Sequence, residues 1–116
     1  MNSRRPEKKA KTDLLQGTLD LIVLRLLQSG PANGWDITQR MHVLSGETLK
    51  LNYGSLYPAL HRLETRGWIT SEWGESENGR KAKFYRLTRA GGKQLVAERE
   101  VWERFSSAMK AILQGA

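Results

Sequence analysis

The stretch Asn52–Ile69, NYGSLYPALHRLETRGWI, has the pattern on which the predicted fold depends most. Its apolar residues recur at the spacing of three to four that places them on one helical face: Leu56, Leu60 and Leu63. The opposite face is polar, basic and aromatic, and it holds Ser55, Pro58, His61 and Arg62, with Tyr57 on its flank. Pro58 fits the first turn of a helix, where no N–H partner is lost, and Gly67 fits its end. This pattern predicts a short amphipathic helix that is either an ordinary surface helix or one that enters a groove of DNA.

Length and charge limit the class of protein. The chain has 116 residues, enough for one domain with a dimerising extension, and a net charge of +7 that favours a polyanionic partner. It has no cysteine, which excludes a disulfide framework and a thiolate metal site. No apolar run approaches the roughly 20 residues that a membrane-spanning helix needs, and the N-terminus is too polar for a signal peptide. We therefore expect a soluble, cytoplasmic protein.

The N-terminal part divides into a tail and a core helix. Residues 1–12 are basic and polar, which predicts a flexible tail that either touches phosphates or only aids solubility. From Leu14 onward apolar residues almost surround the helix, which predicts a buried helix that ends near Gly30 and is capped by Asp13 or Thr18.

A second helix is expected from about Trp35 to Leu44, after a turn, with Asn33 as its cap. Its inward residues are predicted to be Ile37, Met41 and Leu44. Together with the helix over residues 52–67, it has the proportions of a helix-turn-helix.

The periodicity then changes to that of a β-hairpin. Two runs rich in β-forming residues, 68–73 and 84–88, flank the pair Asn78-Gly79, which is a strong hairpin signal. The second half of the hairpin and the segment after it hold six basic residues and no acidic one: Arg80, Lys81, Lys83, Arg86, Arg89 and Lys93. A basic hairpin after a helix-turn-helix predicts a wing that reaches phosphates or the minor groove, and a solvated charged hairpin is the alternative.

A last helix is predicted from its cap, Thr88, to about Leu113. Apolar residues near the a and d spacing of a coiled coil mark one of its faces: Leu95, Trp102, Phe105, Met109 and Ile112. One winged domain has little core left to cover this stripe, so we expect a homodimer interface there, with docking on its own domain as the alternative. Trp102 is expected to flank a pocket for a flat, apolar ligand, although core packing is the more common role of a tryptophan.

Four segments within residues 14–92 resemble the PadR family of bacterial transcriptional regulators: LLQGTLDLIVLRLL, GPANGWDI, NYGSLYPALHRLETRGWI and WGESENGRKAKFYRLTRAG. The resemblance implies a homodimeric winged helix-turn-helix repressor that binds palindromic operators and responds to a small effector. The single C-terminal helix resembles the short subclass, in which that helix builds the dimer and some members bind aromatic ligands between the subunits. This sequence departs from the family at Trp35, where a tyrosine is usual, so we expect Trp35 to keep the packing role while any contact of that hydroxyl is lost.

Carried over to this sequence, the resemblance implies that the major groove is contacted by Ser55, Tyr57, Pro58 and His61, with Arg62 nearer its edge. It implies wing contacts by Arg80, Lys81 and Lys83. Asn52 and Tyr53, just before the recognition helix, are expected to hold a phosphate. The expected fold is mainly α with a small β-hairpin, and it divides into a flexible tail (1–12), a winged helix-turn-helix DNA-binding domain (13–88) and a C-terminal dimerisation helix (89–116).

Two other classes of protein are not expected from this sequence, and one alternative stays open. An enzyme is not expected, because the chain has only two histidines, no cysteine and no glycine-rich phosphate motif, and so offers no catalytic pair, cofactor site or metal cluster. A membrane-surface protein is not expected either, because the basic residues cluster on the hairpin rather than along an amphipathic helix. The alternative that stays open is a winged-helix module that binds protein or RNA without sensing a ligand.

Overall fold

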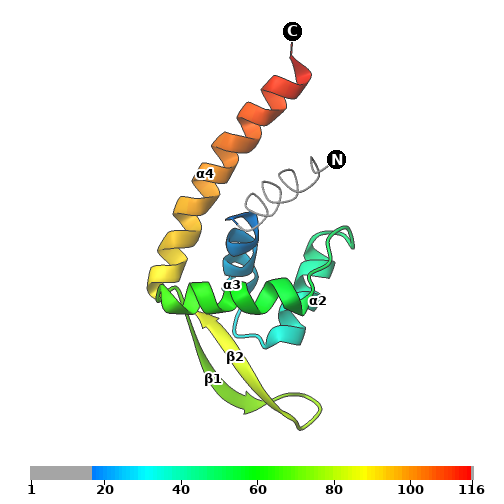
Figure 1. Ribbon diagram of the computed structural model, residues 1–116, viewed down its shortest axis with the longest axis vertical. Coiled ribbons are helices and arrows are strands. Elements are labelled where there is room, and N and C mark those ends of the chain that lie inside the picture. Colours follow the sequence, from blue (N-terminus) through cyan, green and yellow to red (C-terminus); the bar gives the residue numbers. More distant parts are fainter. Residues whose placement is uncertain (1–16, 116) are drawn as a thin grey trace, which may run out of the picture.

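The computed structural model describes residues 17–115, and the structural statements below concern that part of the chain. Helical backbone covers residues 17–28, called the first helix here, and is followed by α2 (Gly34–Leu44), α3 (Tyr53–Thr65), β1 (Ile69–Glu75), β2 (Lys81–Leu87) and α4 (Arg89–Gln114). The fold is mainly helical with one antiparallel hairpin, as the sequence predicts (Figure 1). The predicted tail, residues 1–12, and the predicted cap Asp13 lie outside the described residues.

The core lies where the first helix meets α2, α3, the hairpin and the beginning of α4. Its largest fully buried side chains are all aliphatic: Val23, Leu24, Leu27, Ile37, Leu56, Leu60, Leu63, Ile69 and Leu95. The apolar first helix is therefore a core helix, as predicted. The prediction that Leu44 points inward is wrong, because this last residue of α2 faces an open groove and is 57% exposed.

Side-chain hydrogen bonds fix the turn between the first helix and α2. Asn33 caps α2 as predicted: its side-chain oxygen accepts from the N–H of Asp36 at 2.8 Å, and the Asp36 carboxylate accepts from the N–H of Asn33 at 3.2 Å. The Arg40 guanidinium donates to three backbone carbonyls at and before this turn, at 2.9, 2.7 and 3.0 Å. Ala32 exchanges two backbone hydrogen bonds with Tyr85 of β2, at 2.9 and 2.8 Å, so the turn also anchors the hairpin.

α3 begins directly after its cap Asn52, whose side-chain oxygen accepts from the N–H of Ser55 at 2.9 Å. Pro58 therefore lies in the second turn, inside the helix, and the prediction that it occupies the first turn is wrong. Because Pro58 is exposed, the backbone bond that it cannot donate is missing on the solvent side of the helix. Gly67 follows the helix with a φ of 78°, which favours glycine, as predicted for the stop.

β1 and β2 form the predicted antiparallel hairpin. In the loop, the N–H of Ser76 donates to the carbonyl of Arg80 at 2.8 Å, and the N–H of Gly79 donates to the carbonyl of Ser76 at 2.9 Å. Gly79 has a φ of 75° whereas Asn78 does not enter the left-handed region. The loop is therefore a longer turn with one left-handed glycine, not a two-residue Asn-Gly turn.

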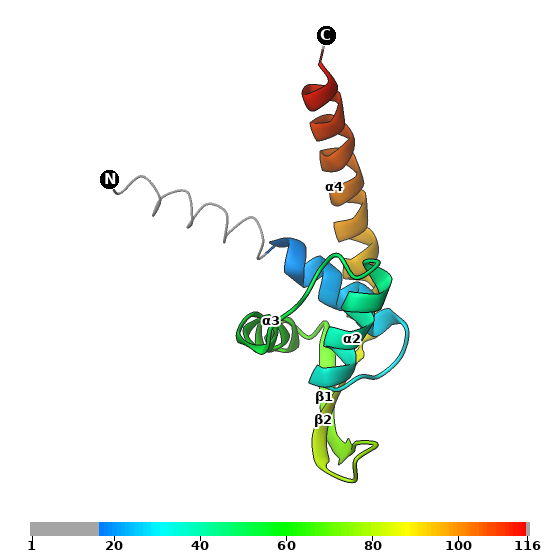
Figure 2. The ribbon, with the colours of Figure 1, turned by 90° about the vertical axis from the view of Figure 1, so that its right-hand side faces the viewer.

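α4 starts at its predicted cap, Thr88, whose hydroxyl accepts from the N–H of Gly91 at 3.0 Å. Its first turns pack on the body, where Leu95 joins the core with 1% of its surface exposed. Toward its C-terminal end the helix leaves the body, so this end and the hairpin lie at opposite ends of the molecule (Figure 1, Figure 2).

Candidate nucleic-acid interface

α3 has one face in the core and one face free. Its buried residues are Leu56, Ala59, Leu60 and Leu63. Its exposed side includes four residues predicted to contact the major groove: Ser55, Tyr57, Pro58 and His61. This division is what a helix needs if it is to rest on a core and insert into a groove of DNA.

Two other predicted contact residues have partners inside the protein. Asn52 uses its side-chain oxygen to cap α3. Arg62 forms an ion pair with Asp20 of the first helix, with Nη2 2.7 Å from one carboxylate oxygen and Nε 3.4 Å from the other. Both side chains are largely buried, and Nη1 of Arg66 lies 3.8 Å from the same carboxylate. Arg62 therefore ties α3 to the first helix instead of extending toward the groove.

The hairpin turns one face toward α3. On this inner face Ile69 is buried, and the Ser71 hydroxyl donates to the Glu64 carboxylate of α3 at 2.6 Å. Tyr85 stands opposite Ser71 and is also buried. Burial raises the pKa of the Tyr85 phenol above its usual value, and the nearby Tyr57 and Glu64 add to the rise. These contacts fix the hairpin against α3.

The predicted wing contacts, Arg80, Lys81 and Lys83, lie at and beside the turn of the hairpin. Nζ of Lys83 lies 6.0 Å from the ring centroid of Tyr85. Among the described residues, none of the three forms an ion pair with a carboxylate. Their charges are therefore available to phosphates.

A cleft of about 810 Å³ separates the wing from the beginnings of α2 and α3. It brings Tyr53 and Tyr57 of α3 together with all three hairpin cations, Arg80, Lys81 and Lys83, around one space. Ser55, Pro58 and His61 are not part of its lining. The cleft also contains two tryptophans that the sequence did not single out as contacts, Trp35 of α2 and Trp73 of β1.

The predicted dimer residues of α4 fall into two groups. Leu95 is buried in the core of its own chain, so it is not free to contact a second copy, and its assignment to the dimer seam is wrong. The other four are exposed: Trp102, Phe105, Met109 and Ile112. The Trp102 and Phe105 rings lie 6.0 Å apart, centroid to centroid. Within residues 17–115, no other element covers this part of the stripe.

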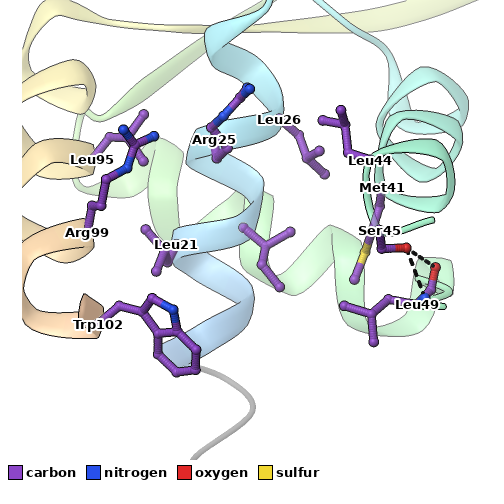
Figure 3. A pocket seen from close by; sticks show the side chains of 11 residues that line it. Leu21, Arg25, Leu26, Met41, Leu44, Ser45, Leu49, Leu95, Arg99 and Trp102 are labelled. Carbon is purple, nitrogen blue, oxygen red and sulfur yellow. Dashed lines mark hydrogen bonds between the residues drawn. The ribbon is translucent and has the colours of Figure 1, made fainter. Parts of the chain in front are cut away.

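An apolar groove of about 410 Å³ lies between the first helix, α2 and α4 (Figure 3). Trp102 is at one end of it, next to Leu21 of the first helix, and Leu44 and Leu49 lie on the opposite side. The lining is mostly aliphatic, with Arg25 and Arg99 as its charged residues. Trp102, the one residue predicted to flank an effector pocket, therefore lies beside an open apolar space.

Asp20 and Trp73 were not predicted from the sequence, and Trp35, which was expected to keep a packing role, is instead 61% exposed at the cleft. Asp20 is the single acidic residue of the first helix within residues 17–28. A carboxylate in so apolar a helix is the signal that indicates a buried ion pair. For Trp73, the signal is a large apolar ring in a strand whose other exposed residues are polar.

No group of three His, Asp or Glu side chains that could hold a metal occurs among residues 17–115. None of the helices in that range is long and apolar enough to cross a membrane.

The chain is similar to known proteins in both sequence and fold. The sequence profile of the Transcriptional regulator PadR-like family matches residues 23–97. The chain is 38% identical over 63 residues to the transcriptional regulator Rv3488 of Mycobacterium tuberculosis, covering 54% of this chain and 58% of that protein. It is 31% identical to a transcriptional regulator from Clostridium thermocellum of known structure, with a TM-score of 0.76 over 84% of this chain and 95% of that one. A PadR-like transcriptional regulator from Bacillus cereus is 25% identical, with a TM-score of 0.74 over 90% and 99% of the two chains.

Proposed function

Because this chain belongs to the PadR-like family of transcriptional regulators, we propose that it is a homodimeric repressor that binds an inverted-repeat operator in duplex DNA. In this proposal it acts in the cytoplasm and catalyses no reaction. The observation that carries the proposal is the free polar face of α3 beside a wing whose three cations have no carboxylate partner among the described residues.

In the proposed complex α3 lies in the major groove and the wing reaches the phosphates and the minor groove beside it. The exposed face of α3 supplies the contacts to base edges and backbone: Ser55, Tyr57, Pro58 and His61. The wing supplies Arg80, Lys81 and Lys83. Arg62 acts indirectly, because its ion pair with Asp20 holds α3 on the first helix.

The proposed dimer is supported by the uncovered stripe of α4. Its exposed apolar residues run from Trp102 to Ile112, which is about 15 Å of helix at 1.5 Å per residue. A second copy related by a two-fold axis would cover the stripe on both chains with the same contacts. Such a pair presents two recognition helices, which suits half-sites about one turn of DNA apart, roughly 34–36 Å.

A small aromatic or apolar effector is proposed to bind in the groove beside Trp102. The groove is lined mostly by aliphatic side chains of three helices, as pockets for apolar ligands are. A ligand there touches the first helix, which holds Asp20 and through it Arg62 of α3. A ligand that shifts the first helix would therefore also shift the recognition helix, and this is how its binding could release the protein from DNA.

The proposal is tested by binding and sedimentation. A duplex selected from a random pool should contain an inverted repeat and bind more tightly than a random duplex. Lys81→Ala should weaken binding to both duplexes and lower the slope of log affinity against log salt by about one. Lys110→Ala removes the same charge at the far end of α4 and serves as the control. His61→Ala should weaken binding to the selected duplex by about 1–3 kcal/mol, with a smaller effect on the random one.

Two outcomes would contradict the proposal. A protein that sediments as a monomer at micromolar concentration would exclude the paired recognition helices. A protein that does not bind duplex DNA at low salt, but captures RNA or another protein, would favour the alternative winged module.

A further inference from the structure

Large aromatic side chains are exposed around the cleft between the wing and the recognition helix: Trp35, Tyr53, Tyr57 and Trp73. Trp73 has 66% of its surface exposed and Trp35 has 61%, whereas an indole that only fills space is mostly buried. Single exposed apolar residues are normal on a protein surface, but several around one hollow mark a binding site. The cleft is therefore suited to a ligand with apolar surface.

Trp73 points over the cleft because of its position in β1. Alternate residues of a strand point to the same face, and Trp73 shares its face with the buried Ile69 and with Ser71, which is bonded to α3. It lies farther along the wing than these two, opposite Lys83. On the other side of the cleft, Trp35 belongs to the first turn of α2.

The two tyrosines of α3 lie next to each other in the lining of the cleft. A Cβ placed on Gly34 would lie 2.6 Å from Oη of Tyr57 and 3.6 Å from Cε1 of Tyr53, so both phenol rings lie close to the beginning of α2. Their ring centroids are 5.6 Å apart. Glycine at position 34 is what allows Tyr57 this close approach.

The charges around the cleft are balanced. Its lining contains the cations Arg80, Lys81 and Lys83 and the carboxylates Asp36, Glu75 and Glu77. One of these carboxylates, Asp36, is already committed to the cap of α2. Because the lining carries no net charge, a phosphate chain in this cleft would gain affinity from contacts with the rings as well as from the cations.

We infer that this cleft holds the sugar–phosphate backbone of one DNA strand, with deoxyribose groups packed against the indoles of Trp35 and Trp73. The inference rests on the proposed function, because a helix in the major groove and a wing in the next minor groove have one backbone between them. Lys81 and Lys83 bind phosphates of that strand while the rings cover its sugars. Since sugars carry no sequence information, the two tryptophans add affinity to every duplex.

Affinity measurements with the full chain test the inference on the selected and the random duplex. Trp73→Ala and Trp35→Ala should each weaken binding to both duplexes by roughly tenfold, the loss expected when one face of an aromatic contact is removed. The salt slope should stay unchanged because no charge is removed, whereas Lys81→Ala lowers it by about one. Thr70→Ala, on the other face of β1, is the matched control and should bind like the wild type.

Tryptophan fluorescence gives an independent readout. Binding of the duplex should quench the wild-type emission. Most of the quenching should disappear in the double variant Trp35→Phe, Trp73→Phe, and it should persist in Trp68→Phe, whose changed ring packs against the core outside the lining of the cleft. Circular dichroism of the double variant checks that it is folded.

Three results would contradict the inference. Wild-type affinity in both alanine variants, with quenching retained in the double variant, would overturn it and leave the proposed function standing, because the cleft would then suit a protein partner. Weaker binding with a lowered salt slope would show that the tryptophans only position the cations. Absence of duplex binding by the wild type would refute both the inference and the proposed function.

Discussion

Replacing Gly91 by alanine should destabilise the protein, because this glycine is where α4 touches the beginning of the wing. A Cβ at position 91 would lie 1.9 Å from the carbonyl oxygen of Trp68 and 2.8 Å from Cδ1 of Leu87. The Trp68 oxygen is not free to move, since it accepts a hydrogen bond from the N–H of Thr88 at 3.0 Å. Unbonded carbon atoms rest about 3.5–4.0 Å apart, so α4 would have to shift by more than about 1 Å.

Three contributions determine how much Gly91→Ala changes the free energy of unfolding. Overpacking costs about 1–3 kcal/mol, and weakening the bond between Thr88 and Trp68 costs about 1 kcal/mol. The higher helix propensity of alanine offsets about 1 kcal/mol. The free energy of unfolding should therefore fall by about 1–3 kcal/mol, which lowers Tm by roughly 5–15 °C in a domain of this size.

Gly92→Ala is the matched control for Gly91→Ala. No atom lies within 4 Å of a Cβ at position 92, so the same change one residue later should stabilise the helix by about 0.5–1 kcal/mol. Urea unfolding followed by circular dichroism measures both variants, at one protein concentration because a dimer's stability depends on it. Equal free energies of unfolding for the two variants would refute the close contact between α4 and Trp68.

Two further predictions concern buried polar groups. A double-mutant cycle with Asp20→Asn and Arg62→Gln should give a coupling of about 1–2 kcal/mol, because both side chains are largely buried. The exposed pair Glu72–Arg86 should give less than about 0.5 kcal/mol, and equal couplings would mean that Arg62 is free to contact DNA. Burial raises the pKa of Tyr85, so its contribution to stability is complete below about pH 10 and is lost as the pH rises through the higher folded value. Between about pH 9 and 12, Tm should fall more steeply for the wild type than for Tyr85→Phe, and parallel curves would contradict this cause.

Features that depend only on residues close together in the sequence, such as helix caps and turns, could be predicted. Asn33 and Thr88 cap their helices by accepting the N–H three residues later. Gly67 and Gly79 adopt the positive φ that ends α3 and closes the hairpin loop. Each of these features needs only local chemistry, so periodicity, cap residues and glycine positions were sufficient.

Contacts between distant segments could not be predicted in the same way. Periodicity places Arg62 beside His61 on the polar side of α3, but only the fold brings it to Asp20, 42 residues earlier. Alternation in β1 puts Trp73 on one face with Ser71, yet it does not say which face looks at α3. The bond from Ser71 to Glu64 settles that direction. A helix wheel or a strand pattern gives relative positions within one element and no information on what lies opposite.

The stripe on α4 shows how one sequence pattern can serve two contacts. Leu95 and Trp102 are seven residues apart in the sequence, yet Leu95 is buried in its own chain and Trp102 is partly exposed. A straight helix leaves a rounded body after a few turns, so the same stripe passes from the core to the surface. In the proposed dimer a second copy would extend this apolar contact, and the groove beside Trp102 lies where the two contacts meet. Whatever fills the groove touches the first helix, which holds α3 through Asp20, and this adjacency is the reason to expect DNA affinity to depend on its occupant.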